Sequence, residues 1–317
     1  MKKQHNSGPY KQKSLKQTTI KVTENSPLMN FLQNHFPHQS RTTIKSILVH
    51  RQVSIDGRII TRHDHQLQPG QTVTVNWSRA PEEIRYPGLK IIFEDKYLIV
   101  IEKEAGMLSI ATDKETMKTA YSILSSHVKK NGQKNKIFVV HRLDRETSGI
   151  MIFAKNQEVQ QKLQERWSET IMERTYVAVA EGSFEKDKGT IINYLYESKA
   201  LKMYITPDTA LGQKAVTHFR VMMKNDSYTL LEINLETGRK NQIRVHMQEL
   251  GHSIIGDKKY GSTVNPVRRL GLHALIISFI HPESGKIMRF ETPVPSIFLK
   301  LFRNPKKNPK TTNPDFL

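Results

Sequence analysis

Apolar residues follow two different spacings along the chain, and the change of spacing marks off a small first unit. Between residues 26 and 77 they first recur three to four positions apart, which predicts two helices, the second capped by Ser40. The spacing then shortens to two around Asp56-Gly57 and again at 72–75, which predicts a hairpin and a further strand. This region is therefore expected to form a compact α/β unit.

The longer region, residues 89–302, alternates between strand-like and helix-like patterns. Strands are expected at 89–93, 97–101, 150–154, 175–180, 214–224, 228–236, 272–280 and 286–291, and helices at 115–130, 156–167 and after 236. In the last helix Ile243 and Leu250 share a side that we expect to face inward, while Asn241 and Arg244 share a polar side. Arg244 is therefore predicted on a polar stripe beside a buried one.

Basic residues outnumber acidic ones, 49 to 30, which gives a formal net charge of +19. Such a surplus favours a polyanion as partner, because cationic side chains release counterions from phosphates. A membrane is the alternative, but no apolar run approaches the roughly 18 residues of a spanning helix, and the amino terminus lacks a signal-peptide centre. The cytoplasm is therefore the expected location. The absence of cysteine excludes disulfides, thiol catalysis and cysteine-ligated zinc.

Part of the positive charge lies at the two ends of the chain. Residues 1–25 hold six lysines against one glutamate, and residues 303–317 are basic and rich in proline, so both are expected to be flexible arms. These arms either grip phosphates or only keep the chain soluble, and the sequence leaves both open. Residues 79–88, rich in charge and proline, are expected to form a linker.

One stretch, residues 139–151, places a dense polar segment between two apolar runs that are typical of short buried strands. Each polar group left unpaired in a buried loop costs about 1 to 3 kcal/mol, so this segment calls for an explanation. One interpretation is a turn in which Asp144 and Thr147 bond nearby backbone and Gly149 takes a positive φ. The other is an active site, and the local residues alone leave the choice open.

Several other catalytic patterns are absent from the sequence. It contains no glycine-rich phosphate loop, no dinucleotide-binding fingerprint and no His-Glu-x-x-His motif. His246 and His252 are weak evidence for a metal, and no metal site is predicted. Asp144 and Glu146 are too close in one loop to face each other across about 5 to 10 Å, as glycosidase carboxylates do. A reaction without a cofactor, led by one carboxylate, fits this inventory best.

Three motifs resemble those of the RluA-type pseudouridine synthases. Residues 141–149 match the family's signature loop position for position, residues 174–182 are similar to its second motif, and residues 237–246 to its third. They occur in the family's order within residues 89–302. The resemblance implies an α+β fold, in which the catalytic domain has a mixed, mainly antiparallel central sheet flanked by helices and loops.

The first unit, residues 26–78, is similar in size, order and turns to the small RNA-binding module named after ribosomal protein S-four. Its helices carry Arg41, Lys45 and Arg51, which are expected to contact RNA, although an ordinary solvated helix surface is the alternative. By analogy with family members that carry this module, the implied substrate is large-subunit ribosomal RNA. The chain is expected to act as a monomer.

The resemblance also implies roles for three residues. Asp144 would be the catalytic carboxylate, acting without metal or cofactor on a uridine whose base detaches through nitrogen and rejoins through carbon. Whether it adds to the uracil or assists at the anomeric carbon stays open. Arg244 would keep this carboxylate ionised and aimed, since a nearby opposite charge favours the charged form. Tyr176 would stack on the base, a plain strand aromatic being the alternative.

The residues expected to contact RNA near the reaction are His141, Arg142, Arg239 and Asn241. A uridine inside folded RNA must be extracted, at a cost of a few kcal/mol, and Arg142 would occupy the vacated space. Alternatively, Arg142 contacts a phosphate or pairs with Glu146. His141 either bonds the loop or the RNA backbone, or it is purely structural.

This sequence departs from the family pattern at three positions. Asn241 stands where the third motif usually has histidine, Arg174 replaces a common lysine, and Glu104 follows Lys103 where proline is frequent. Asn241 can still donate and accept hydrogen bonds, and Arg174 keeps its charge. We therefore expect the departures to affect RNA contacts more than the reaction.

Other functions compete with an isomerase that modifies ribosomal RNA. The basic arms and the small first unit also suit an RNA chaperone or ribosome-assembly factor whose catalysis is dispensable. Transfer RNA is an alternative substrate for the same reaction. An enzyme that cleaves glycans or nucleosides would instead release a free base or sugar.

Overall fold

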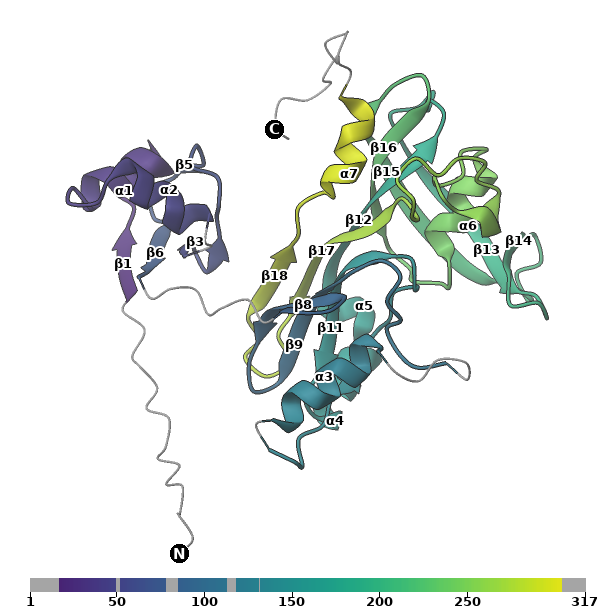
Figure 1. Ribbon diagram of the computed structural model, residues 1–317, viewed down its shortest axis with the longest axis horizontal. Coiled ribbons are helices and arrows are strands. Elements are labelled where there is room, and N and C mark those ends of the chain that lie inside the picture. The colour runs from purple at the N-terminus through teal and green to yellow at the C-terminus, as the bar shows by residue number, and fades with distance from the viewer. Residues whose placement is uncertain (1–16, 50–51, 78–84, 113–117, 131, 304–317) are drawn as a thin grey trace, which may run out of the picture. The chain divides into compact units, whose positions relative to one another are not determined.

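The computed structural model describes residues 17–49, 52–77, 85–112, 118–130 and 132–303. The chain divides into two compact units, residues 1–83 and 84–317 (Figure 1). Each unit has its own hydrophobic core. Most of both expected arms, most of the expected linker and Arg51 lie outside the described residues.

The first unit packs two helices against a four-stranded antiparallel sheet. The strand order is β1 (Gln17–Lys21), β6 (Thr72–Asn76), β3 (Val53–Ile55) and β4 (Arg58–Ile59); the helices are α1 (Leu28–His35) and α2 (Arg41–Val49), and β2 (Ser26–Pro27) pairs with β5 (Gln66–Leu67). Ser40 caps α2 as predicted, because its Oγ accepts the Thr43 N–H at 3.1 Å. The hairpin predicted around Asp56-Gly57 joins β3 and β4, and both turn residues take positive φ.

Strand β1 corrects the expected extent of the amino-terminal arm. Residues 17–21 pair with β6 along their whole length, and Trp77 Nε1 donates to the Thr18 hydroxyl at 2.8 Å. Residues 17–21, expected from the high lysine content of residues 1–25 to belong to a flexible arm, are therefore the edge strand of a sheet. On α2, Arg41 and Lys45 are both exposed, four positions apart.

The second unit is built on one large sheet. Its main order is β14-β13-β15-β16-β12-β17-β11-β9-β8-β7, with β10 beside β11 and β18 beside β17. The strands are β7 (Arg85–Tyr86), β8 (Leu89–Glu94), β9 (Leu98–Lys103), β10 (Phe138–Val139), β11 (Ser148–Ala154), β12 (Ile171–Glu181), β13 (Lys188–Glu197), β14 (Met203–Thr206), β15 (Gln213–Lys224), β16 (Tyr228–Leu235), β17 (Leu272–Ile280) and β18 (Ile287–Glu291). Within the described residues β11 and β17 pair in parallel and the other pairs are antiparallel, so the mixed, mainly antiparallel sheet is confirmed.

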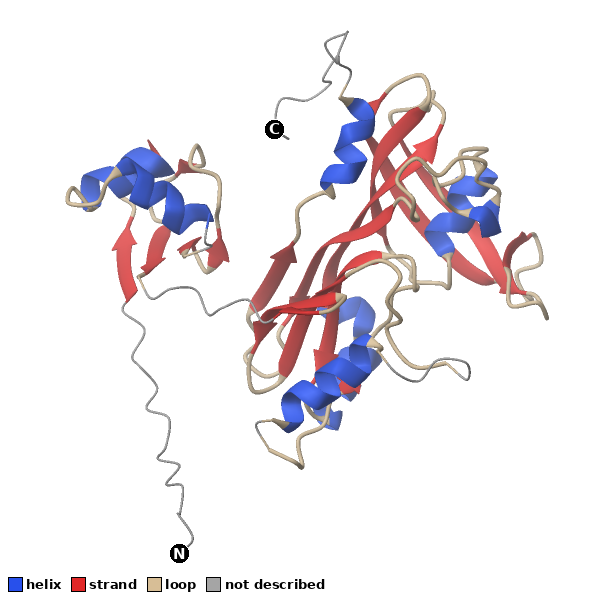
Figure 2. Ribbon diagram, in the orientation of Figure 1, coloured by secondary structure: helices blue, strands red, loops and turns tan. Residues whose placement is uncertain are grey.

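Helices cover both faces of this sheet (Figure 2). They are α3 (Ala120–Lys129), α4 (Gln157–Glu165), α5 (Trp167–Thr170), α6 (Gln242–Glu249) and α7 (Ser296–Leu299), with short 3-10 turns η1 (Lys258–Tyr260) and η2 (Lys300–Phe302). Alternate residues of β11 pack against α3 on one face and α4 on the other, and those of β12 against α6 and α7. Because both faces are buried, these strands are apolar without alternation.

Several elements differ from the sequence-based expectation. The helix expected from residue 115 is described from Ala120, where Thr119 and Ser122 form a capping box. The helix expected at 156–167 is split into α4 and α5. Leu250, expected to face inward, follows the last residue of α6 and is 38% exposed. No sequence pattern predicted β13 and β14.

Candidate active site

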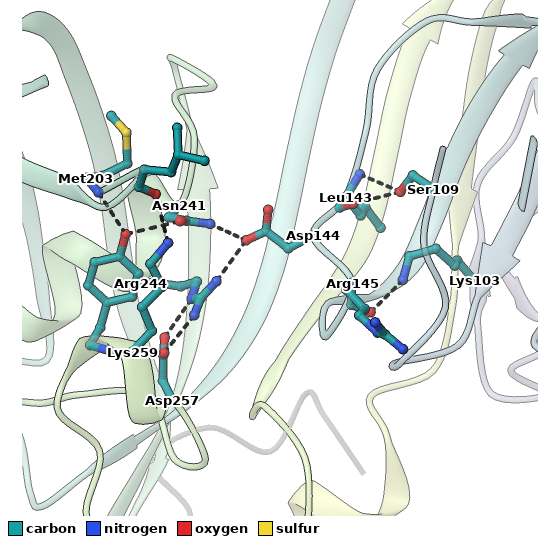
Figure 3. A network of polar contacts seen from close by, with 12 residues as sticks. Lys103, Ser109, Leu143, Asp144, Arg145, Met203, Asn241, Arg244, Asp257 and Lys259 are labelled. Atoms are coloured by element: carbon teal, nitrogen blue, oxygen red, sulfur yellow. Dashed lines mark hydrogen bonds and ion pairs between the residues drawn. The ribbon is translucent and has the colours of Figure 1, made fainter. Parts of the chain in front are cut away.

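The loop between β10 and β11 carries Asp144, and its backbone is anchored on both sides of that residue (Figure 3). On one side Ser109 Oγ donates to the Leu143 carbonyl at 2.6 Å and accepts the Leu143 N–H at 3.2 Å. On the other side Lys103 Nζ donates to the Arg145 carbonyl at 3.1 Å. These anchors fix the position from which the Asp144 side chain leaves the loop.

Lys103 is a fully buried cation at the end of β9. Besides the loop, its ammonium donates to the carbonyls of Glu104 at 3.0 Å and Met107 at 2.8 Å. Burial lowers the pKa of Lys103 to about 8, against the attraction of Glu146 and Asp144. The sequence pattern alone predicts no role for this lysine.

Gly149, Ala274 and Tyr176 lie in one row across β11, β17 and β12. Gly149 has a φ of 115°, and a Cβ added there would lie 2.2 Å from the Ala274 carbonyl oxygen. The positive φ predicted for Gly149 is therefore confirmed, and only glycine fits at this close approach. The pairing of β11 with β17 places the Asp144 loop near the strand that carries Tyr176.

The segment before α6 is held by the buried side chain of Gln242. Its Oε1 accepts hydrogen bonds from the Thr237 hydroxyl at 2.8 Å and the Arg239 N–H at 2.9 Å. Its Nε2 donates to the Val216 carbonyl at 3.0 Å and the Thr217 hydroxyl at 2.9 Å. A buried amide with four partners fixes this turn, a function that sequence reasoning missed although Gln242 lies within the third motif.

Asn241 precedes α6 in a left-handed conformation, with a φ of 52°, which asparagine adopts more readily than most residues. Its Nδ2 donates to Oδ2 of Asp144 at 2.5 Å, and Arg244 Nη1 donates to the same oxygen at 3.2 Å. The structure thus brings the two residues of the predicted polar stripe to the predicted carboxylate. Asn241, which stands where the family usually has histidine, therefore contacts that carboxylate, whereas the sequence predicts it among the RNA contacts.

Arg244 also forms an ion pair with Asp257, a buried carboxylate. Arg244 Nε and Nη2 donate to the two oxygens of Asp257 at 2.6 and 2.7 Å, which is a bidentate ion pair. Burial alone would lower the pKa of Arg244, but Asp257 and Asp144 raise it overall, so the guanidinium stays charged. Asp257 could not be identified from its position in the sequence, because it follows Arg244 by thirteen residues and lies outside the three motifs.

A pocket of about 300 Å³ opens onto this network. It is lined by Arg142, Leu143, Asp144, Thr147, Tyr176, Leu235, Gly238, Arg239, Lys240, Asn241, Gln242, Ile243, Arg244 and Leu272. Residues from all three sequence motifs therefore meet in one cavity. Its volume is at the lower end of the range typical of small-ligand sites.

Tyr176 lies on the wall of this pocket next to two hydrophobic clusters. Burial raises the pKa of its phenol, Arg174 opposes this change, and Asp144 adds to it, so the hydroxyl keeps its proton at neutral pH. Arg174 Nη2 donates to the carbonyls of Leu235 at 3.3 Å and Glu236 at 3.1 Å. Arg174 thus braces the end of β16 beside the pocket.

The other residues expected to contact RNA are placed differently. Arg142 is exposed and lines the pocket, two positions before Asp144. Arg239 also lines it, and its Nε donates to the Lys214 carbonyl at 3.0 Å. His141 does not line it: burial lowers its pKa to about 4, and its Nε2 accepts the Ile152 N–H at 3.0 Å. His141 therefore braces the loop as a neutral side chain.

A larger pocket, of about 760 Å³, is bordered by Glu146 together with residues of β9, β17 and the segment before α7. Asp144 does not line this pocket. Glu146 is exposed and forms its ion pair with Arg145 at 3.8 Å, not with Arg142. Asp144 and Glu146 therefore face different cavities, which excludes a facing pair of the glycosidase kind.

His246 and His252, the weak candidates for a metal, are engaged separately. His246 Nδ1 bonds the Thr217 hydroxyl at 2.9 Å, whereas His252 Nδ1 bonds the Glu181 carbonyl at 2.8 Å. Among the residues that the structure describes, no three histidine or carboxylate side chains gather closely enough to hold a metal ion. In the same part of the chain, no helix combines the length and apolarity needed to cross a membrane.

The fold and this pocket define an enzyme site in which one carboxylate, aimed by an arginine and an amide, lies beside a protonated phenol. Residues 97–249 match the family model described as RNA pseudouridylate synthase. With the relatives described next, this shows that the chain belongs to the RNA pseudouridine synthase family, so the resemblance seen in the sequence is confirmed.

Two curated relatives match over most of their length. An uncharacterized RNA pseudouridine synthase of Bacillus subtilis, YhcT, is 32% identical over 83% of this chain and 88% of its own. The ribosomal large subunit pseudouridine synthase D of Escherichia coli K12 is 30% identical over 90% of this chain and 93% of its own. Among solved structures, human RNA pseudouridylate synthase domain containing 4 shares the fold, with a TM-score of 0.54 and 22% identity over 66% of this chain and 90% of that one.

Proposed function

We propose that this RNA pseudouridine synthase isomerises specific uridines of large-subunit ribosomal RNA, with Asp144 as its catalytic carboxylate. The observation that carries the proposal is that Asp144, Tyr176 and Arg244, from three distant motifs, line one pocket. Arg244 donates to Asp144, so the charge and direction of the carboxylate suit attack on an electron-poor ring or anomeric carbon.

The reaction breaks the bond from ribose C1′ to uracil N1 and forms a bond from C1′ to C5; C5 loses its proton and N1 gains one, so the product is an isomer of the substrate. The Asp144 carboxylate adds either to the uracil ring or to C1′. Tyr176 offers a face on which the base stacks and a protonated hydroxyl for proton transfer, since burial raises its pKa. Arg244, held by Asp257, keeps the carboxylate aimed while the base turns.

The RNA contacts follow from what surrounds the pocket. Arg142 is exposed on it and is our candidate for the side chain that fills the space left by the flipped uridine. Arg239 lies on the same pocket and would bind a neighbouring phosphate. Asn241 and His141, also expected to contact RNA, are better supported as residues that hold the carboxylate and the loop.

The choice of large-subunit ribosomal RNA rests on relatives that are named for it. The first unit supports RNA binding, because Arg41 and Lys45 are exposed on α2 of a small domain that we propose to be S-four-like. Each lost phosphate contact reduces the salt dependence of binding, so Arg41→Ala/Lys45→Ala should flatten the dependence of RNA affinity on salt by about two units of slope. An unchanged slope would remove this face from RNA binding. We also propose that the enzyme acts as a monomer in the cytoplasm.

The decisive test maps pseudouridine in purified large-subunit ribosomal RNA after incubation with wild-type enzyme and Asp144→Asn. We expect Asp144→Asn to reduce formation at every wild-type site by at least roughly a thousandfold, as loss of an essential catalytic group does. Glu146→Gln, which changes an exposed carboxylate two positions away, is the matched control and should retain activity. Equal activity of wild type and Asp144→Asn would refute the assignment, and modification of transfer RNA alone would refute the substrate.

A further inference from the structure

The Asp144 carboxylate is held by one of its two oxygens. Both hydrogen bonds that the described residues donate to it, from Asn241 Nδ2 and Arg244 Nη1, end on Oδ2. In Figure 3 both dashed lines reach the same oxygen of Asp144 and leave the other without one. The two oxygens are therefore not equivalent: one is fixed by the protein and the other is available.

The orientation of the Asn241 amide follows from its second partner, Tyr260. The Tyr260 hydroxyl accepts the backbone N–H of Met203 at 3.2 Å and donates to Asn241 Oδ1 at 3.0 Å. A hydroxyl has one proton to donate, and a carboxylate only accepts. Because Tyr260 donates to Oδ1, the amide must turn its Nδ2 toward Asp144. The carboxylate requires the same orientation, because it can only accept a hydrogen bond.

Tyr260 is well suited to hold another side chain in place. It is fully buried, and the Arg244 guanidinium lies over its ring at 4.9 Å from the centroid. Its backbone N–H donates to Asp257 Oδ1 at 3.2 Å, the carboxylate that also grips Arg244. Both donors to Asp144 are thus held by a single turn, residues 257–260: Asp257 holds Arg244, and Tyr260 holds Asn241.

We infer that Tyr260 is a positioning residue, which acts through Asn241 to fix Asp144 Oδ2 and so presents Oδ1 to the uridine. This inference rests on the proposed catalytic role of Asp144. Asparagine serves at this position because its amide both accepts and donates, and so links a phenol to a carboxylate. Its left-handed backbone conformation also suits asparagine.

The test compares Tyr260→Phe, Asn241→Gly and the double variant in steady-state kinetics on large-subunit ribosomal RNA. Asn241→Gly removes the amide but tolerates the positive φ. We expect each single variant to lower kcat by roughly tenfold to a hundredfold, because a small misplacement of the reacting group has effects of this size, with KM changed less than about twofold. If Tyr260 acts through Asn241, the double variant should match Asn241→Gly alone, because coupled residues are not additive.

Tyr86→Phe is the matched control, since it removes another phenol hydroxyl, one bonded to His127 Nδ1 at 2.9 Å, and should leave kcat unchanged. Independent, multiplying effects of Tyr260→Phe and Asn241→Gly would overturn the inference, as would wild-type kcat in either single variant. If Tyr260→Phe does not fold, Asn241→Gly still tests whether fixing Asp144 Oδ2 matters for kcat. Asn241 is only half-buried, so its replacement should be tolerated by the fold. An inactive Asp144→Asn beside a fully active Tyr260→Phe refutes this inference alone, whereas an active Asp144→Asn refutes the proposed function.

Discussion

Lys103→Met tests whether the buried ammonium supports the Asp144 loop. The change keeps the length of the side chain but removes the donor to the carbonyls of Glu104, Met107 and Arg145. Leaving a buried acceptor unpaired costs about 1 to 3 kcal/mol, and these carbonyls are partly buried. The same change also removes a desolvated charge, which offsets part of this cost, so we expect the free energy of unfolding at pH 7.5 to fall by less than this. We also expect kcat to fall tenfold or more, because the loop backbone beside Asp144 loses an anchor.

The pH dependence of this difference has a defined sign. The pKa of Lys103 is lowered from 10.5 to about 8 in the folded protein, so between these values the unfolded chain binds more protons. The free energy of unfolding therefore rises with pH in this window, at roughly 1.4 kcal/mol per pH unit at most. Between pH 7.5 and 9.5 the stability of wild type should rise, relative to Lys103→Met, by about 2 kcal/mol.

Urea unfolding of both proteins at pH 7.5, 8.5 and 9.5 measures this, with other titrating groups cancelling in the difference. Lys155→Met is the control for activity, because it removes an ammonium that bonds Glu94 and the Asp95 carbonyl at 2.7 Å and no residue of the loop. A wild-type stability that does not rise relative to Lys103→Met would show that Lys103 is not a desolvated cation. Full activity in Lys103→Met would show that the loop needs no anchor at this point.

Three further changes probe other contacts. Gly149→Ala should lower the free energy of unfolding by at least about 3 kcal/mol in urea, because the new Cβ meets the Ala274 carbonyl. Asp257→Asn should lower kcat by roughly a hundredfold with little change in KM, because Arg244 loses half of a bidentate pair; a change in KM alone would contradict this. Burial lowers the pKa of His273 from 6.5 to about 3, so the free energy of unfolding falls as pH drops below 6.5. His273→Gln should reduce this loss, as measured by urea unfolding between pH 6.5 and 4.

The fold was predictable where apolar spacing is regular or where a strand is buried on both faces. Strand β11 is wholly buried, and its run of apolar residues marked it in the sequence. By contrast β13 exposes Ile192 at 57% and β14 exposes Tyr204 at 41%, so neither strand shows a clean alternation of apolar and polar positions. Strand β1 was hidden because it lies in a lysine-rich segment and because it depends on a partner, β6 (Thr72–Asn76), from much later in the chain.

The sequence motifs predicted the residues that line the pocket, but not the residues that hold them in place. Asp144, Tyr176 and Arg244 stand in segments whose residue order identifies a family. The residues that support them, Lys103 and Asp257, lie outside these three motifs, and they act through contacts that form only when distant strands and turns come together. Sequence spacing predicts neighbours along one element, but it does not predict which side chain a folded turn will deliver.

Asn241 shows why a departure from a family pattern cannot be interpreted without the folded neighbours. In the sequence it is a neutral replacement in a basic segment, so a role in RNA contacts was the natural reading. In the structure its left-handed backbone turns the amide inward, between the Tyr260 hydroxyl and the Asp144 carboxylate. A side chain that must accept at one end and donate at the other is constrained by both partners, so this replacement bears on how the carboxylate is aimed.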